Sequence, residues 1–110
     1  MSALERIRKI AEKLKIEYAP DIYSGDAKRW VTYNYETIES RLFADDRAIE
    51  VVSGMQVHLF NPIAESSTQI TNQFAEELEA AGFTYPEITV MVDQNPEYRH
   101  TIFEFETEDI

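Results

Sequence analysis

Apolar side chains recur every three or four residues between Met1 and Leu14, and charged side chains fill the positions between them. This period predicts an amphipathic helix of about three turns that packs on a sheet. Ser2 is expected as its N-cap, with Glu5 completing a capping box.

The segment that follows, residues 17–29, contains Pro20, Gly25 and two aspartates, and it is expected to be a turn-rich connection. A short edge strand at residues 16–18 or 22–23 is the alternative in this segment.

Strict alternation of apolar and polar residues predicts strands in the next part of the chain. Residues 30–36 are rich in β-branched and aromatic types and predict one strand, and residues 49–60 predict a longer one. The more polar residues 37–48 are expected to form the loop between them. Gly54 within the long strand indicates a bulge or a close approach of the backbone.

A second helix is predicted after the long strand. Asn61 and Pro62 are typical of a helix entry, with Asn61 as N-cap and Pro62 at the first helical position. Alternatively, the turn continues and Ser66 or Ser67 is the cap. Gly82 is expected at the C′ position that ends this helix.

The last quarter of the chain, with alternation in residues 88–92 and 101–106 around a turn at residues 93–97, predicts a hairpin. Residues 1–110 are therefore expected to form a single α+β domain. We predict a mainly antiparallel four-stranded sheet with two helices packed on one face, in the order α-β-β-α-β-β, and with the other face partly open.

The net charge of −11 changes this picture, because it is unevenly distributed. Residues 1–55 hold nine basic and ten acidic side chains, whereas residues 56–110 hold eleven acidic ones and a single basic one, Arg99. Such a surface repels phosphate backbones, so nucleic-acid binding is not expected. It indicates solubility, a surface that repels nucleic acid, or a surface that imitates it.

Composition also limits the chemistry. The absence of cysteine excludes disulfides, thiol nucleophiles and thiolate metal sites. No apolar run is long enough for a transmembrane helix, and the charged N-terminal helix lacks the apolar core of a signal peptide. We therefore expect no membrane partner and a cytoplasmic site of synthesis.

No catalytic set or glycine-rich phosphate loop is recognisable. His58 and His100 are expected to be surface or interface residues. Asp45 and Asp46, with help from Glu50, could bind a hard cation, although adjacent acids in a loop usually remain solvated. We predict no enzyme activity, no cofactor and no metal site.

The aromatic residues instead indicate a function that depends on contacts made by the protein surface. Trp30, Tyr33 and Tyr35 lie in one predicted strand, and the chain holds six tyrosines. They form either a core with one aromatic face, or an uncovered sheet face or edge that pairs with another subunit.

Four segments carry a resemblance to a known family. They are Val57 to Pro62, Glu79 to Phe83, Ile88 to Val92 and Tyr98 to Glu106. With this order of elements and the small size, the chain resembles the tail terminator (tail completion) proteins of long-tailed bacteriophages.

The resemblance implies a structural subunit that forms a hexameric ring on the tail tube, stops its polymerisation and provides the docking surface for the head side. The implied partners are further copies of the chain, the tail tube protein and a head-completion or neck protein. The implied location is the virion, at the head–tail interface, after assembly in the host cytoplasm. Another neck or head–tail joining protein is the first alternative, and an acidic nucleic-acid mimic that inhibits DNA-binding enzymes is the second.

Two exposed loops are our candidates for subunit or partner contacts. Their residues are Leu42, Phe43, Asp45, Asp46 and Arg47 in the first, and Gln94, Asn95, Pro96, Glu97 and Tyr98 in the second.

A ring of six chains would carry a formal charge of 6 × −11 = −66. If Glu76, Glu77 and Glu79 line its central hole, DNA would pass through without specific binding, because the phosphates are repelled.

Overall fold

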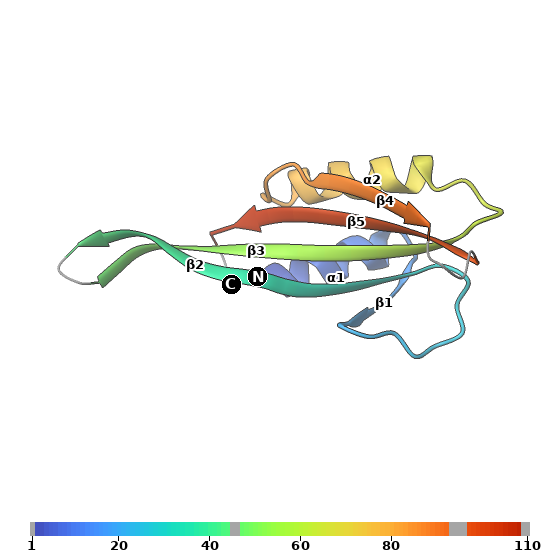
Figure 1. Ribbon diagram of the computed structural model, residues 1–110, viewed down its shortest axis with the longest axis horizontal. Coiled ribbons are helices and arrows are strands. Elements are labelled where there is room, and N and C mark those ends of the chain that lie inside the picture. The colour runs from blue at the N-terminus through green and yellow to red at the C-terminus, as the bar shows by residue number, and fades with distance from the viewer. Residues whose placement is uncertain (1, 45–46, 93–96, 109–110) are drawn as a thin grey trace.

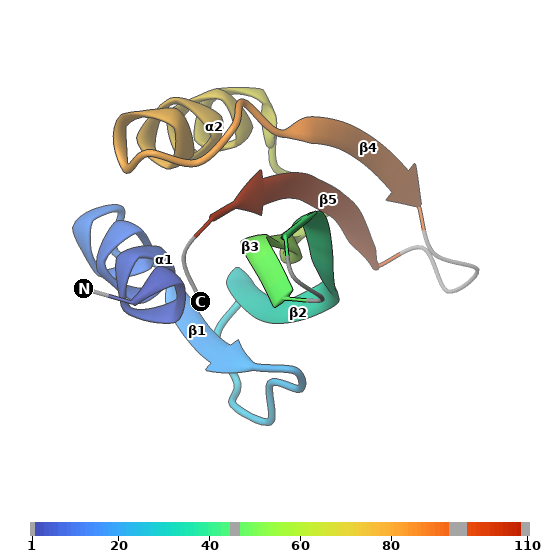
Figure 2. The same cartoon turned by 90° about the vertical axis from the view of Figure 1, so that its left-hand side faces the viewer.

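Two helices pack on one face of a five-stranded mixed sheet whose strand order is β1-β2-β3-β5-β4 (Figure 1, Figure 2). The computed structural model describes residues 2–44, 47–92 and 97–108, with the backbone alone for residues 40–44 and 47–51. The elements are α1 (Ala3–Lys13), β1 (Glu17–Pro20), β2 (Trp30–Ala44), β3 (Arg47–Pro62), α2 (Thr68–Ala80), β4 (Glu87–Val92) and β5 (Tyr98–Thr107).

The first helix begins where its capping residue predicts. The Ser2 hydroxyl accepts a hydrogen bond from the Glu5 backbone N–H at 3.2 Å, which supplies a partner for one of the free donors of the first turn. One face of α1 is buried through Ala3, Ile7 and two further apolar residues.

The second helix ends as predicted but begins later. Gly82 has a φ of 96°, and the N–H groups of Gly82 and Phe83 donate to the carbonyls of Glu79 and Leu78 at 3.0 and 3.2 Å. These two bonds form a Schellman motif, for which glycine is the favoured residue.

The predicted helix entry at Asn61 and Pro62 is wrong, because both residues still belong to β3. The Asn61 side chain is fully buried and donates to the carbonyls of Pro62 and Glu65 at 3.0 and 2.8 Å. Since it stabilises the loop after β3, it is not free to cap a helix, and Ser67 occupies the N-cap position instead.

One core fills the space between the helices and the sheet. It contains apolar residues of α1 and α2, and from the sheet it contains Val31, Tyr33, Met55, Val57, Leu59, Phe103 and Phe105. Arg6 joins the two helices and the last strand: its guanidinium donates to the Ala81 carbonyl at 2.5 Å and to the Thr107 hydroxyl at 3.2 Å. The same group lies 4.2 Å from the centre of the Phe83 ring.

The fold class is α+β with two helices, but the predicted four-stranded sheet and the order α-β-β-α-β-β are wrong. The additional strand is β1, which pairs in parallel with β2 from Glu17 opposite Trp30 to Pro20 opposite Tyr33. It has only four residues and lies at the edge of the sheet, where Pro20 is tolerated because no further strand needs its missing N–H.

The predicted loop over residues 37–48 is also wrong. β2 continues to Ala44 and β3 begins at Arg47, so this segment belongs to a long hairpin. Polar and charged residues in this segment do not alternate regularly with apolar ones, so the sequence does not show its strand character.

Candidate assembly surfaces

The paired ends of β2 and β3 project from the body as a two-stranded arm (Figure 1). β3 pairs with β5 only as far as Ser53 opposite Thr107. Beyond that point, from Glu39 opposite Val52 to Ala44 opposite Arg47, β2 and β3 pair only with each other in the described part of the sheet. The molecule is accordingly elongated, 55 Å along its longest axis against 29 and 24 Å along the others.

The base of the arm is marked by a bulge. Tyr35 lies opposite Met55 and Thr37 opposite Gly54, so Glu36 is the extra residue in β2. A side chain at Gly54 would place its Cβ 2.6 Å from the Thr37 hydroxyl oxygen. The bulge expected near Gly54 is therefore present, in the strand opposite it, and the Thr37 side chain fills the space that a side chain at Gly54 would need.

The arm includes part of the first predicted contact segment. Leu42 and Phe43 lie in β2 and Arg47 begins β3, whereas Asp45 and Asp46 lie outside the described residues. A cation site on this aspartate pair therefore stays a hypothesis.

The described part of the second predicted contact segment, at the start of β5, lies at the end of the molecule opposite the arm (Figure 1). Glu97 is exposed and Tyr98 is half-buried at the start of β5, whereas Gln94, Asn95 and Pro96 lie outside the described residues. The structure does not bring the two segments together.

The sheet face opposite the helices carries a ladder of stacked aromatic rings. Trp30 lies between the rings of Tyr23 and Phe60, with centroid distances of 5.2 and 5.1 Å, and the Tyr98 ring meets its edge at 4.9 Å. The Phe60 ring stacks in turn on His100 at 4.4 Å. This face is thus more apolar than a fully solvated sheet face.

The ladder ends in a hydrogen-bonded histidine pair. Nδ1 of His58 lies 2.8 Å from Nε2 of His100, and Nε2 of His58 lies 3.2 Å from Oε1 of Gln56. An amide oxygen only accepts, so His58 donates through Nε2 and accepts from His100 through Nδ1. Burial and the neighbouring His100 lower the pKa of His58, and the Glu104 carboxylate opposes them in part.

The glutamates predicted to line a central hole differ in their surroundings. Glu76 and Glu79 are exposed on α2. The Glu77 carboxylate instead forms an ion pair with the Lys13 ammonium of α1 at 2.7 Å. Glu77 therefore contributes to the contact between the helices, and two of the three acids face solvent.

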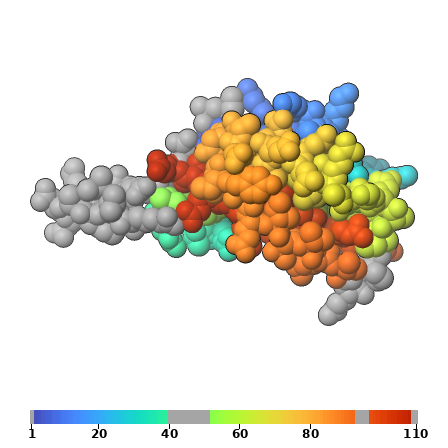
Figure 3. Space-filling model, turned by 90° about the horizontal axis from the view of Figure 1, so that it is seen from above, coloured from blue at the N-terminus to red at the C-terminus, as the bar shows by residue number. Residues whose placement is uncertain are grey.

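The outer edge of the sheet is a surface that the sequence did not indicate. In the edge strand β4, Val90, Met91 and Val92 are 55%, 46% and 55% exposed. Figure 3 shows β4 beside α2 on one face of the molecule. Alternation predicted a half-buried strand here, and only the strand order shows that no further strand of the described chain covers this edge.

The described residues show no metal cluster, and the chain matches no known family. No cluster of three or more metal-ligating side chains occurs among the residues whose side chains are described. No helix in residues 2–44, 47–92 and 97–108 is long and apolar enough to cross a bilayer. No protein-family model matches the chain, and no curated protein matches it significantly.

Proposed function

We propose that this chain is a ring-forming structural subunit of a bacteriophage tail, a tail terminator that caps the tail tube and offers a docking surface to the head side. The observation that carries the proposal is the two-stranded arm, together with the resemblance in sequence to tail terminators. A two-stranded ribbon is marginally stable alone in water, and its unpaired edges are templates for strand pairing. An arm of this kind fits a role in binding a neighbouring subunit.

The exposed edge strand β4 supports the same proposal. Val90, Met91 and Val92 present both apolar side chains and an unpaired backbone edge within the described chain. The arm and the β4 edge are different surfaces, so their contact would be heterologous. Heterologous contacts between identical subunits close into rings when the rotation between neighbours permits.

Charge supports the passage of DNA through such a ring. Glu76 and Glu79 are exposed, and α2 has no basic residue in its last turn to neutralise them. If this helix faces the lumen, phosphates would be repelled from the wall, and DNA would slide through without a specific contact.

The test is the mass of the purified chain by light scattering at several concentrations, with negative-stain microscopy of the largest species. The matched variant replaces residues 40–51 by Asn-Gly, so that this two-residue turn connects Glu39 to Val52. These residues face each other in register, and Asn-Gly is a favoured two-residue hairpin turn. We expect a hexameric ring for the full chain and a folded monomer for the shortened one.

A ring that needs the tube as its template would leave the full chain monomeric alone. In that case, we expect it to bind isolated tail tubes and the shortened variant not to bind them. Equal assembly of both chains would refute a role for the arm. A monomer or dimer that ignores tubes but binds a basic protein in a strongly salt-dependent manner would favour the nucleic-acid mimic.

A further inference from the structure

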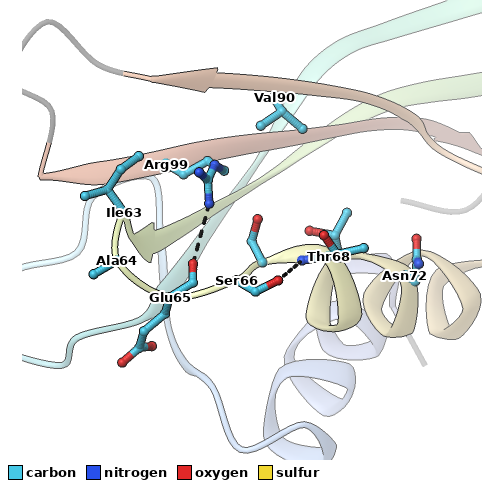
Figure 4. Close-up of a pocket in the computed structure, with 10 residues that line it drawn as sticks. Ile63, Ala64, Glu65, Ser66, Thr68, Asn72, Val90 and Arg99 are labelled. Atoms are coloured by element: carbon cyan, nitrogen blue, oxygen red, sulfur yellow. Dashed lines mark hydrogen bonds between the residues drawn. The ribbon is translucent and has the colours of Figure 1, made fainter.

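A cavity of about 570 Å³ lies at the N-terminus of α2, between this helix, the loop after β3 and strands β4 and β5 (Figure 4). One wall is apolar and consists of Ile63, Ala64 and Val90. The other is polar and is formed by Glu65, Ser66, Ser67, Thr68, Thr71, Asn72 and Arg99.

The polar wall carries positive charge in an otherwise acidic half of the chain. Arg99, the one basic residue of residues 56–110, extends from β5 into the cavity, and its guanidinium lies 3.5 Å from the Glu65 carbonyl (Figure 4). The Glu65 carboxylate is turned away from Arg99 and lies 3.7 Å from Arg29 instead.

The helix N-terminus adds to this charge. The first-turn N–H groups of a helix lack intrahelical acceptors and carry a partial positive charge. The first turn of α2 holds no acidic residue, although the chain has 21. The Thr68 N–H donates to the Ser66 hydroxyl at 3.4 Å, but no negative charge offsets the partial positive charge of this terminus beside the Arg99 guanidinium, an arrangement that favours a bound anion.

Two buried residues in the same wall carry hydroxyl groups without a hydrogen bond to the rest of the described chain. Ser67 and Thr71 are 7% and 9% exposed, and both line the cavity. Ser67 sits at the N-cap position but makes no capping hydrogen bond. Neither side chain forms a hydrogen bond with any other described residue, so both are available to a ligand in the cavity.

We propose that this cavity binds an oxyanion, a carboxylate or a phosphate attached to a small apolar group. The Arg99 guanidinium, the first-turn N–H groups of α2 and the Ser67 hydroxyl would hold the charged oxygens. The apolar wall of Ile63, Ala64 and Val90 would contact the rest of the ligand. The site does not depend on the proposed function, because it lies within one subunit.

The experiment is an amide NMR titration of the full chain with inorganic phosphate, acetate and butyrate at constant ionic strength, with chloride as reference. We expect saturable shifts centred on residues 67–71 and on Arg99. Tighter binding of phosphate than of acetate would assign a phosphate head group, and the reverse order a carboxylate. Butyrate should bind more tightly than acetate if the apolar wall contributes.

Arg99→Gln should weaken binding roughly tenfold, because it removes a charge-assisted hydrogen bond. Lys9→Gln removes the same charge from an exposed position of α1 and should leave binding unchanged. Ser67→Asp supplies a carboxylate to the helix N-terminus, so it should raise the melting temperature and abolish binding of the added anion. The absence of saturable shifts for all three anions, or equal binding by Arg99→Gln, would overturn the proposal.

Discussion

Nδ1 of His58 accepts a hydrogen bond from Nε2 of His100 at 2.8 Å, across the neighbouring strands β3 and β5. This bond requires a neutral His58, because a protonated ring has no acceptor nitrogen. Gln56 fixes the other nitrogen as a donor, and Glu104 is the carboxylate that attracts a proton to the ring. The pair is therefore sensitive to pH.

The free energy of unfolding is expected to fall as the pH drops below about 6.5, the ordinary pKa of histidine. The pKa of His58 is lowered in the folded chain, so the unfolded chain binds more protons below that pH. The contribution of the neutral His58 pair to the free energy of unfolding is fully present above the ordinary pKa. It is lost as the pH falls towards the pKa of His58 in the folded chain. Urea denaturation of the wild type and of His58→Gln between pH 8 and pH 5 measures it.

His100→Gln provides the control for this effect. Since His100 lowers the pKa of His58, its removal should move the His58 titration, followed by NMR, towards the ordinary value. Parallel stability curves for the wild type and His58→Gln would contradict the prediction.

Thr101→Val should raise the free energy of unfolding by about 1 kcal/mol. The substitution replaces a buried hydroxyl by a methyl group, which removes the cost of desolvating the hydroxyl and breaks no hydrogen bond. Thr101 is fully buried in β5, and its hydroxyl has no partner among the described residues. Thr89→Val is the matched control on exposed β4, where a change within about 0.5 kcal/mol is expected. Destabilisation by Thr101→Val would indicate that the hydroxyl has a partner in solution.

Gly82→Ala should lower the free energy of unfolding by about 1 kcal/mol, because an alanine at a φ of 96° is strained. Gly82→Asn should cost less, since asparagine is the second choice at this helix terminus. Thermal unfolding of both variants measures the difference. A Cβ at residue 82 would also lie 3.3 Å from an Arg6 nitrogen, so equal losses would assign the cost to that contact.

Phe43→Asp should weaken assembly while leaving the circular dichroism spectrum unchanged, because Phe43 lies on the arm, outside the body that holds the core. The measurements are light scattering and binding to tail tubes. Ile22→Asp introduces the same charge at a side chain that is 81% exposed in the loop after β1, and it should leave assembly intact. An unaltered ring with Phe43→Asp would remove this residue from the interface.

The helix termini were predictable from the sequence where the signal is local. Ser2 caps the first helix and Gly82 ends the second, since each needs only a few neighbouring residues. For the start of α2 the sequence offered Asn61 and, as an alternative, Ser66 or Ser67. The alternative at Ser67 is confirmed, because Asn61 binds carbonyls of its own loop and accepts from Arg29 at 2.6 Å. Only the tertiary contact with Arg29 distinguishes the two roles.

The sheet and its surfaces were harder to predict for a different reason. The pairing of β1 with β2 is a long-range contact that no local pattern of the sequence indicates, and the polar residues of the arm do not alternate regularly with apolar ones. The contact between His58 and His100 depends on strand register, which sequence spacing does not give. The cavity at α2 is likewise lined by Arg99 and Ser67, which come from separate elements that are distant in the sequence.

The contacts of Arg6 have a consequence for synthesis of the chain. Its partners are the Ala81 carbonyl, the Phe83 ring and the Thr107 hydroxyl, all of which are translated long after α1. A ribosome exposes the N-terminal part of a chain first. The contacts of Arg6 therefore form only after β5 has followed α1, so a prematurely terminated chain would lack the bonds that join α1 to α2 and β5 and would be more readily degraded by proteases.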